Sequence, residues 1–166
     1  ISDPGYKLVR DAVAHGVAVF PVPGPSATLA ALVASGLPTD RFLFQGFLPP
    51  RTAGRQRVLE ELAAVPATLI LFESAQRLAE MLTDAAAVLG PRPASVAREL
   101  TKLHEEHRRG SLAELAAAYA GSGPPKGEVV VVIGPPDLAA AGLDDAAVDE
   151  LLREALRSDK PRVAAA

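Results

Sequence analysis

The first quarter of the chain switches between a helical and a strand-like pattern of apolar residues. Between Tyr6 and His15 the apolar residues recur on one helical face, and Gly16 is a suitable stop, so an amphipathic helix is predicted. Val17–Val22 is a continuous apolar run, typical of a buried strand in a parallel sheet. A turn and a second helix, which ends near Gly36, follow. This order predicts half of a doubly wound α/β unit.

From residue 42 onward, the pattern predicts a second series of strands and helices. Expected strands are residues 42–48, 68–72, 94–100, 105–109 and 129–133; expected helices are residues 55–65, a stripe from Leu78 that stops at Gly90, and residues 112–119. Ser111 and Glu114 have the spacing of a capping box. A tail helix over residues 145–157, capped by Asp144, completes the pattern. We therefore divide the chain into residues 1–38, 42–136 and 137–166.

Composition narrows the classes of function. The chain has 166 residues, no Cys and 4% aromatic residues, which argues against disulfide frameworks, cysteine-based zinc sites and an aromatic platform for single-stranded nucleic acid. The formal net charge is -3, so any footprint on RNA must be local. The three His residues form no recognised metal-ligand pattern, and no metal site is expected. No apolar run approaches a membrane-spanning length, so a soluble, cytoplasmic protein without membrane contact is predicted.

Four polar or small-residue segments are candidates for chemistry. The turns at residues 2–5 and 23–27 both lead into helices, where free backbone N–H groups can donate hydrogen bonds to a ligand. The alternative is that both are ordinary turns. Residues 98–106 place charged groups between two predicted strands. They are interpreted either as a catalytic or substrate-binding cluster or as a solvated hairpin whose charges pair across the strands. Glu73 ends a strand, which is where sites form in α/β proteins, whereas Ser74 is explained as a helix cap.

Two groups of basic residues are candidates for phosphate binding. The first, Arg51, Arg55 and Arg57, follows a Pro-Pro pair, and the second is Arg108 with Arg109. Arginine side chains position nucleic acids through their phosphates. In a chain with a net negative charge, the same residues are equally consistent with a solvated surface.

Taken together, seven short segments in one order resemble a known family. They are Ile1-Ser2-Asp3-Pro4-Gly5, Pro23-Gly24-Pro25-Ser26-Ala27, Gly36-Leu37-Pro38-Thr39-Asp40-Arg41-Phe42, Gly46-Phe47-Leu48-Pro49, Phe72-Glu73-Ser74, residues 98–106 (Arg-Glu-Leu-Thr-Lys-Leu-His-Glu-Glu) and Lys126-Gly127-Glu128. Each is weak alone, but the ordered series resembles the ribosomal RNA small-subunit methyltransferase I family of the tetrapyrrole methylase superfamily. The resemblance runs from Ile1 to about Pro136.

The resemblance implies an α/β protein of two domains, with S-adenosylmethionine bound in the cleft between them. It implies a homodimer that transfers a methyl group to a cytidine ribose 2′-hydroxyl of small-subunit ribosomal RNA, in the decoding region. By position, the cofactor cleft would be lined by Pro25, Ser26, Ala27, Phe72, Glu73, Arg98, Glu99, Leu100 and Thr101. Lys102, His104 and Glu105 would be the catalytic candidates near the RNA, which Arg51, Arg55, Arg57, Arg108 and Arg109 would contact.

The sequence departs from the family pattern in two places. Ala75-Gln76 stands where the family usually has Pro-His after Glu-Ser. The family's opening strand and its Asp-Ala-Gly-x-Pro loop are not present, so residues 1–38 are expected to be the remnant of an incomplete first domain, and this chain alone is expected to have little or no activity. Two alternatives remain open: a methyltransferase for corrin or porphyrin precursors, and a non-catalytic module for dimerisation or ribosome binding.

Overall fold

The computed structural model describes residues 5–137 and Arg153. Its elements in chain order are α1 (Gly5–Ala14), α2 (Ala27–Ser35), β1 (Phe42–Phe47), α3 (Thr52–Ala63), β2 (Thr68–Glu73), a 3-10 turn (Ala75–Arg77), α4 (Leu78–Leu89), β3 (Pro93–Arg98), β4 (Glu106–Ser111), α5 (Leu112–Ser122) and β5 (Val129–Ile133). No helix within these residues is long and apolar enough to cross a membrane. The predicted cap at Asp144 and, apart from Arg153, the tail helix lie outside the described residues.

The five strands form one mixed sheet in the order β1-β2-β5-β3-β4. β1 and β2 are parallel, β5 is antiparallel to both β2 and β3, and β4 is antiparallel to β3. It follows that β1, β2 and β3 all run in the same direction. Their carboxyl ends, at Phe47, Glu73 and Arg98, therefore lie along one end of the sheet.

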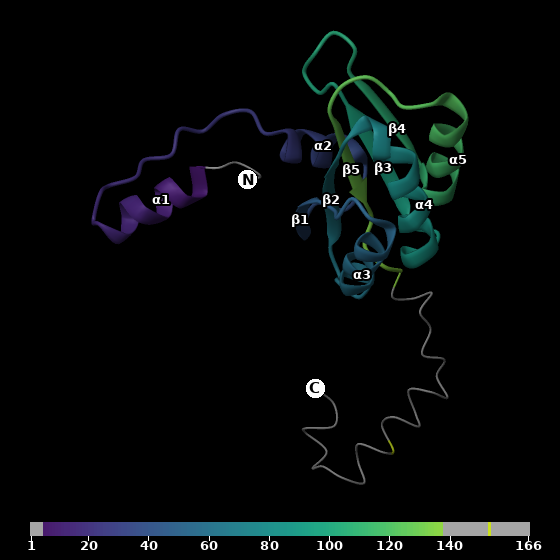
Figure 1. Cartoon of the computed structure of the whole chain (residues 1–166), viewed down its shortest axis with the longest axis horizontal. Helices are drawn as coiled ribbons and strands as arrows, with labels where there is room; N and C mark the ends of the chain where they lie inside the picture. Colours follow the sequence, from purple (N-terminus) through teal and green to yellow (C-terminus); the bar gives the residue numbers. More distant parts are fainter. Residues whose placement is uncertain (1–4, 138–152, 154–166) are drawn as a thin grey trace. The chain divides into compact units, whose positions relative to one another are not determined.

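The core is divided by the central strand β5, which is buried on both faces. Val129, Val131 and Ile133 join the larger cluster, to which α3, α4 and α5 contribute. Val130 and Val132 pack with Ala31 and other residues beneath α2 on the opposite face. The three helices on one side and α2 on the other are seen in Figure 1. An uninterrupted apolar run is what a strand buried on both faces requires.

Local signals place the helix ends as the sequence predicted. Ser26 caps α2 by accepting a hydrogen bond from the Leu29 amide, and Gly36 ends the helix with a φ of 79°, a conformation that glycine adopts without steric cost. The capping box of α5 is present in both directions between Ser111 and Glu114. The strands and helices predicted from residue 42 to 133 are all observed, with small shifts at their ends.

The predicted strand at Val17–Val22 is wrong. These residues form no strand, and Phe20 and Val22 are exposed to 85% and 92%. A strand is stable only where neighbours satisfy its backbone, and no strand in the described part of the chain pairs with this segment. Pro21 also lacks the amide hydrogen that a central strand would donate, a signal that the sequence already contained. Hence residues 6–36 do not form half of a doubly wound unit, and α1 has no buried residue.

Candidate functional site

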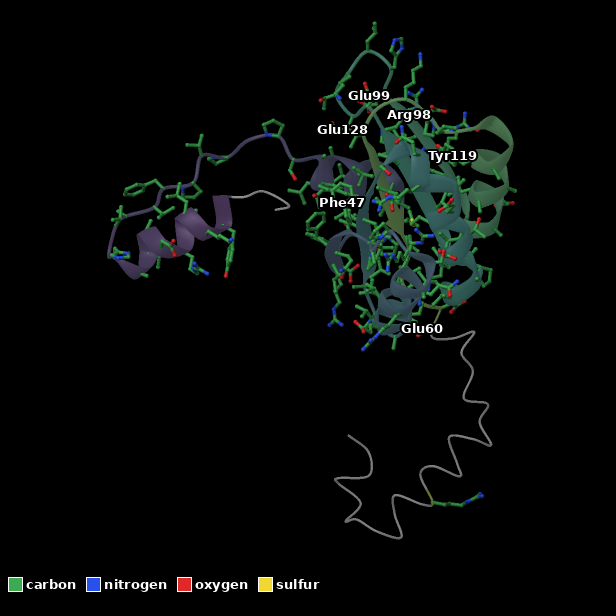
Figure 2. The ribbon with its side chains drawn as sticks, in the orientation of Figure 1. Phe47, Glu60, Arg98, Glu99, Tyr119 and Glu128 are labelled. Atoms are coloured by element: carbon green, nitrogen blue, oxygen red, sulfur yellow. The ribbon has the colours of Figure 1, made fainter. Side chains whose placement is uncertain are left out.

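The candidate site lies at the end of the sheet where β1, β2 and β3 finish. In open α/β sheets, ligands bind beyond the carboxyl ends of parallel strands, because loops there expose polar backbone groups. Figure 2 shows Arg98, Glu99 and Glu128 close to one another at this end, with Glu60 at the other. We name three of the hollows found here after Glu73, Ser26 and Arg108.

The Glu73 pocket has a volume of about 400 Å³. It is lined by Ala27, Phe47, Phe72, Glu73, Ser74, Ala75, Gln76 and residues 127–130. The aromatic wall is rigid, because the Phe72 ring packs edge-on against Phe47, with 5.8 Å between ring centroids. An apolar pocket with a few polar groups is typical of a small-molecule site.

Glu73 is the polar group that distinguishes this pocket. Its side chain is 1% exposed, and its Oε1 accepts hydrogen bonds from the Ser74 amide at 2.6 Å and from the Arg77 guanidinium, whose nearest nitrogen is also 2.6 Å away. The other oxygen, Oε2, is buried and has no hydrogen-bond partner among the described residues. Leaving a buried carboxylate oxygen unpaired is costly. Glu73 thus brings an acceptor with one unused oxygen to the wall of the pocket.

The Ser26 groove lies beside the Glu73 pocket, and Ala27 lines both. It has a volume of about 360 Å³ and is lined by residues 24–27, Leu29, Ala30, Val33, Leu100 and Thr101. The structure thus brings Pro25, Ser26, Ala27, Phe72, Glu73, Leu100 and Thr101 of the predicted cofactor residues to two adjoining hollows. Arg98 and Glu99, the other two, line the Arg108 pocket instead.

The loop between β3 and β4 is held in a strained conformation. Glu99 and Thr101 have φ values of 49° and 64°, which cost a residue other than glycine about 1–3 kcal/mol each. One contact within the loop and one to the segment before β5 hold it in place: the Thr101 amide donates to Glu105 at 2.7 Å, and Glu99 accepts from the Glu128 amide at 3.2 Å. Such strain is concentrated at functional sites in proteins.

The three predicted catalytic residues differ in what holds them. The Lys102 ammonium contacts Glu99 at 3.0 Å, and this hydrogen bond, followed by one to Glu128, raises the lysine pKa. The pKa of Glu105 is lowered, first by the hydrogen bond from the Thr101 amide and then by that from His107. Lys102 is therefore held as a cation and Glu105 as an anion. His104 is exposed and lines the Arg108 pocket.

The structure corrects the prediction for Arg55 and gives Arg109, another predicted RNA-binding arginine, contacts within the protein. The Arg55 side chain is 1% exposed, and its Nε lies 2.6 Å from Asp84 Oδ2, so it has no free face for a phosphate. Arg109 donates to the carbonyls of Ser35 and Ala34, at the end of α2, and so caps that helix.

The other three arginines are exposed, as Arg109 is. Arg57 forms a 3.6 Å ion pair with Glu61, and Arg51 is the residue before the first turn of α3. Arg108 shares Glu106 with Arg98.

Sequence reasoning gave no role to several residues that line these hollows. Phe47, Gly127 and Glu128 border the Glu73 pocket, and Tyr119 and Lys126 border the Arg108 pocket. The segment Lys126-Gly127-Glu128 belonged to the motif series, which was the available signal. Their assembly at one place depends on the sheet order, which no local pattern encodes.

Comparison with known proteins adds the family. A model of the Tetrapyrrole (Corrin/Porphyrin) Methylases matches residues 1–116. The chain belongs to the tetrapyrrole methylase family. It is 55% identical over 153 residues to ribosomal RNA small subunit methyltransferase I of Mesorhizobium japonicum. The aligned region covers 92% of this chain and 51% of that protein. The same-named protein of Erythrobacter litoralis is 52% identical over 157 residues, covering 95% and 55%.

These findings confirm the predicted resemblance. The chain spans about half the length of the curated relatives it matches. Among solved structures of the tetrapyrrole methylase type, uroporphyrin-III C-methyltransferase of Thermus thermophilus, crystallised with S-adenosyl homocysteine, matches with a TM-score of 0.52. It is 21% identical and covers 86% of this chain and 63% of that chain. Diphthine synthase matches with a TM-score of 0.58 at 19% identity, covering 78% and 53%. At these identities, the structures show the fold alone.

Proposed function

We propose that the full-length protein is an S-adenosylmethionine-dependent methyltransferase that modifies a cytidine ribose 2′-hydroxyl of small-subunit ribosomal RNA. The observation that carries the cofactor assignment is the unpaired, buried Glu73 Oε2 in a pocket of suitable size. S-adenosylmethionine has donors that suit this acceptor in its ammonium, adenine amino and ribose hydroxyl groups. The names of the relatives at 55% and 52% identity support ribosomal RNA as the substrate.

The cofactor supplies an electrophilic methyl group on a sulfonium sulfur. The chain must then orient the ribose hydroxyl and accept its proton as the new bond forms. Because Lys102 is held as a cation and Glu105 as a carboxylate with a lowered pKa, both are weak bases. His104 is the base that these contacts favour, with Lys102 positioning the RNA backbone. Arg51, Arg57, Arg108 and Arg109, whose side chains are exposed, are the remaining candidates for RNA contact, and a cytoplasmic homodimer is part of the same proposal.

Two substitutions test the cofactor pocket in the full-length protein by calorimetry with S-adenosylmethionine. Ala27→Trp fills the Glu73 pocket and the Ser26 groove, and we expect binding to be lost. Glu73→Gln keeps the shape of the side chain. Because Arg77 fixes Oε1 as the acceptor, the amide nitrogen takes the place of Oε2 and offers a donor where an acceptor is needed. An unpaired buried group costs about 1–3 kcal/mol, so the affinity should fall roughly tenfold or more.

Ala87→Trp, at an exposed position on α4, is the matched control and should bind the cofactor as the wild type does. Melting curves on all variants separate a lost site from a lost fold. Wild-type affinity in both Ala27→Trp and Glu73→Gln would exclude this pocket. If the wild-type protein binds no S-adenosylmethionine, the proposed activity itself fails.

Single-turnover methylation of purified small subunits tests the catalytic loop. General-base catalysis contributes about 10²–10⁴ in rate, so His104→Ala should slow methyl transfer by that factor without lowering the melting temperature. Lys102→Ala should mainly weaken RNA binding. Leu103→Ala, in the same loop and 93% exposed, is the control and should behave as wild type. A His104→Ala rate equal to that of the control would remove His104 from this role and leave Glu105 as the candidate. Activity on a corrin or porphyrin precursor, but not on subunits, would favour the alternative substrate.

A further inference from the structure

The Arg108 pocket is separate from the Glu73 pocket and has a volume of about 350 Å³. Its walls come from the end of β3, the start of β4, the last turns of α5 and the loop after α5. Lining residues are Arg98, Glu99, His104, Glu106, Arg108, Tyr119 and residues 122–126. Three permanent cations and two carboxylates therefore face one hollow, which leaves an excess of positive charge in a chain whose net charge is -3.

The carboxylate of Glu106 organises two of these cations without saturating them. Its two oxygens lie 2.6 Å from Arg98 Nε and 2.6 Å from Arg108 Nε. The two hydrogen bonds, that of Arg108 first, lower the pKa of Glu106. A guanidinium has five N–H donors, and each of these contacts uses one. The terminal nitrogens of Arg108 thus keep their donors. No ion pair within residues 5–137 involves the ammonium of Lys126.

Tyr119 supports the Arg108 guanidinium from one side. Tyr119 is 4% exposed, and the guanidinium carbon lies 5.2 Å from the ring centroid. A cation at this distance over a ring face is attracted to it, which favours the orientations of Arg108 that keep this contact. Its planar fork suits two oxygens of a phosphate, which is why arginine predominates at such sites.

The loop after α5 places this pocket next to the Glu73 pocket. Gly123–Lys126 line the Arg108 pocket, whereas the next residues, Gly127 and Glu128, line the Glu73 pocket. Two side chains at the end of β3 hold this loop through its backbone. Arg98 donates to the Lys126 carbonyl at 3.4 Å, and Glu99 accepts from the Glu128 amide. The two pockets therefore adjoin along this loop.

We propose that the Arg108 pocket binds a phosphodiester of the RNA substrate, through the free donors of Arg108 and the ammonium of Lys126. Arg98 acts here as a positioning residue, by holding Glu106 and the carbonyl of Lys126, rather than in the cofactor cleft. This inference rests on the proposed function, since it describes how the same protein binds its RNA substrate. An anchored phosphate next to the cofactor pocket fixes which nucleotide reaches the methyl group.

The test compares the full-length wild type with Arg108→Gln, Lys126→Gln and the double variant in binding to small-subunit ribosomal RNA at several salt concentrations. Each lost phosphate contact reduces the slope of log K against log salt by about 0.7–0.9, and weakens binding about five- to tenfold at roughly 0.1 M salt. Arg108→Lys keeps the charge but loses the fork, and should fall between wild type and Arg108→Gln. Arg41→Gln removes one charge from the residue before β1, at the opposite end of the sheet, and is the matched control.

We expect the single variants to lose affinity and slope, the double variant to lose about twice as much slope, and all of them to bind S-adenosylmethionine as the wild type does. The proposed phosphate site is overturned if the double variant has the same slope and affinity as Arg41→Gln. If the wild type still methylates its substrate in that case, the proposed function stands. Absence of cofactor binding and methylation in the wild type would instead refute the function. Loss of binding to intact subunits but not to bare RNA would assign the pocket to an acidic protein partner and also overturn the proposal.

Discussion

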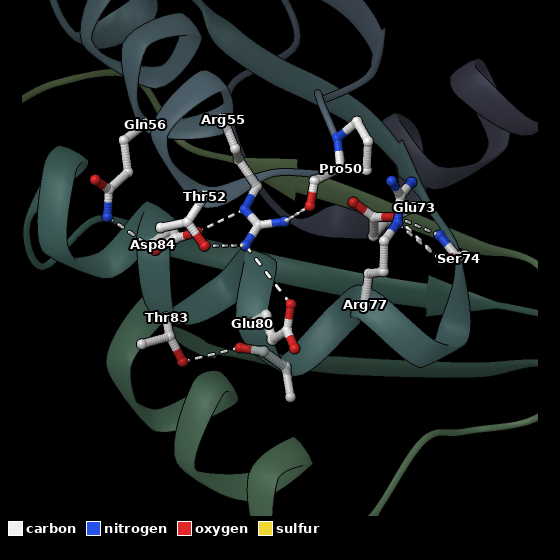
Figure 3. Close-up of polar contacts among 11 residues, drawn as sticks. Pro50, Thr52, Arg55, Gln56, Glu73, Ser74, Arg77, Glu80, Thr83 and Asp84 are labelled. Carbon is white, nitrogen blue, oxygen red and sulfur yellow. Dashed lines mark hydrogen bonds and ion pairs between the residues drawn. The ribbon is translucent and has the colours of Figure 1, made fainter.

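Removal of the Asp84 carboxylate tests whether Arg55 is structural or a contact for RNA. Arg55 and Asp84 side chains are 1% and 10% exposed, and Asp84 also accepts from Gln56 at 2.9 Å (Figure 3). Asp84→Ala leaves a guanidinium that stays protonated, inside the protein and without its partner. Breaking a buried pair on one side costs about 3–5 kcal/mol, so we expect a loss of that size in the free energy of unfolding.

Glu80 provides the matched comparison on the same helix. It lies 3.8 Å from the other side of the Arg55 guanidinium, but its side chain is 72% exposed. Solvent screens such a contact, and exposed pairs contribute at most about 1 kcal/mol. Glu80→Ala should therefore cost much less than Asp84→Ala, although both remove one negative charge next to Arg55.

Urea denaturation, followed by circular dichroism, measures both losses. The double variant Arg55→Met/Asp84→Leu should recover most of the stability, because apolar residues of similar volume replace a buried pair at little cost. Its affinity for small-subunit RNA should equal that of the wild type. The reasoning is refuted if Asp84→Ala costs no more than Glu80→Ala. If the stable double variant binds RNA more weakly than the wild type, Arg55 contributes to RNA binding after all.

Two further predictions concern the Arg108 pocket and its loop. Hydrogen bonds, that from Arg108 first, lower the pKa of Glu106, so its stabilising effect is complete above its ordinary pKa of about 4.3 and is lost as the pH falls through the lower native value. The melting temperature of Glu106→Gln should thus lie below that of wild type at neutral pH, and the gap should close in acid; a constant gap would contradict the assignment. Gly127→Ala would place a Cβ atom 2.1 Å from Glu99 Oε1 at a φ of 93°, whereas Gly123→Ala at 73° meets nothing within 4 Å. Thermal melts should show a larger loss for the first, and equal losses would mean that the Glu99 contact is unimportant.

Much of the secondary structure was determined by the sequence itself. Five consecutive apolar residues at Val129–Ile133 predicted the central strand, and the spacing of Ser111 and Glu114 predicted the start of α5. These signals act over a few residues, through backbone preference, capping and side-chain period, so they can be read locally. The order of the motifs was also enough to indicate the family.

Only the tertiary structure decided which charged and apolar residues are buried and which contacts they make. Arg55 and Arg108 look alike in the sequence, but one is enclosed beside Asp84 and the other faces a pocket beside Tyr119. Partners 29 and 11 residues away in the chain decide this, and they are set by helix packing rather than by any local pattern. The run Val17–Val22 failed as a strand for the same reason, since apolar residues provide the side chains of a strand but only a neighbouring strand provides its hydrogen bonds.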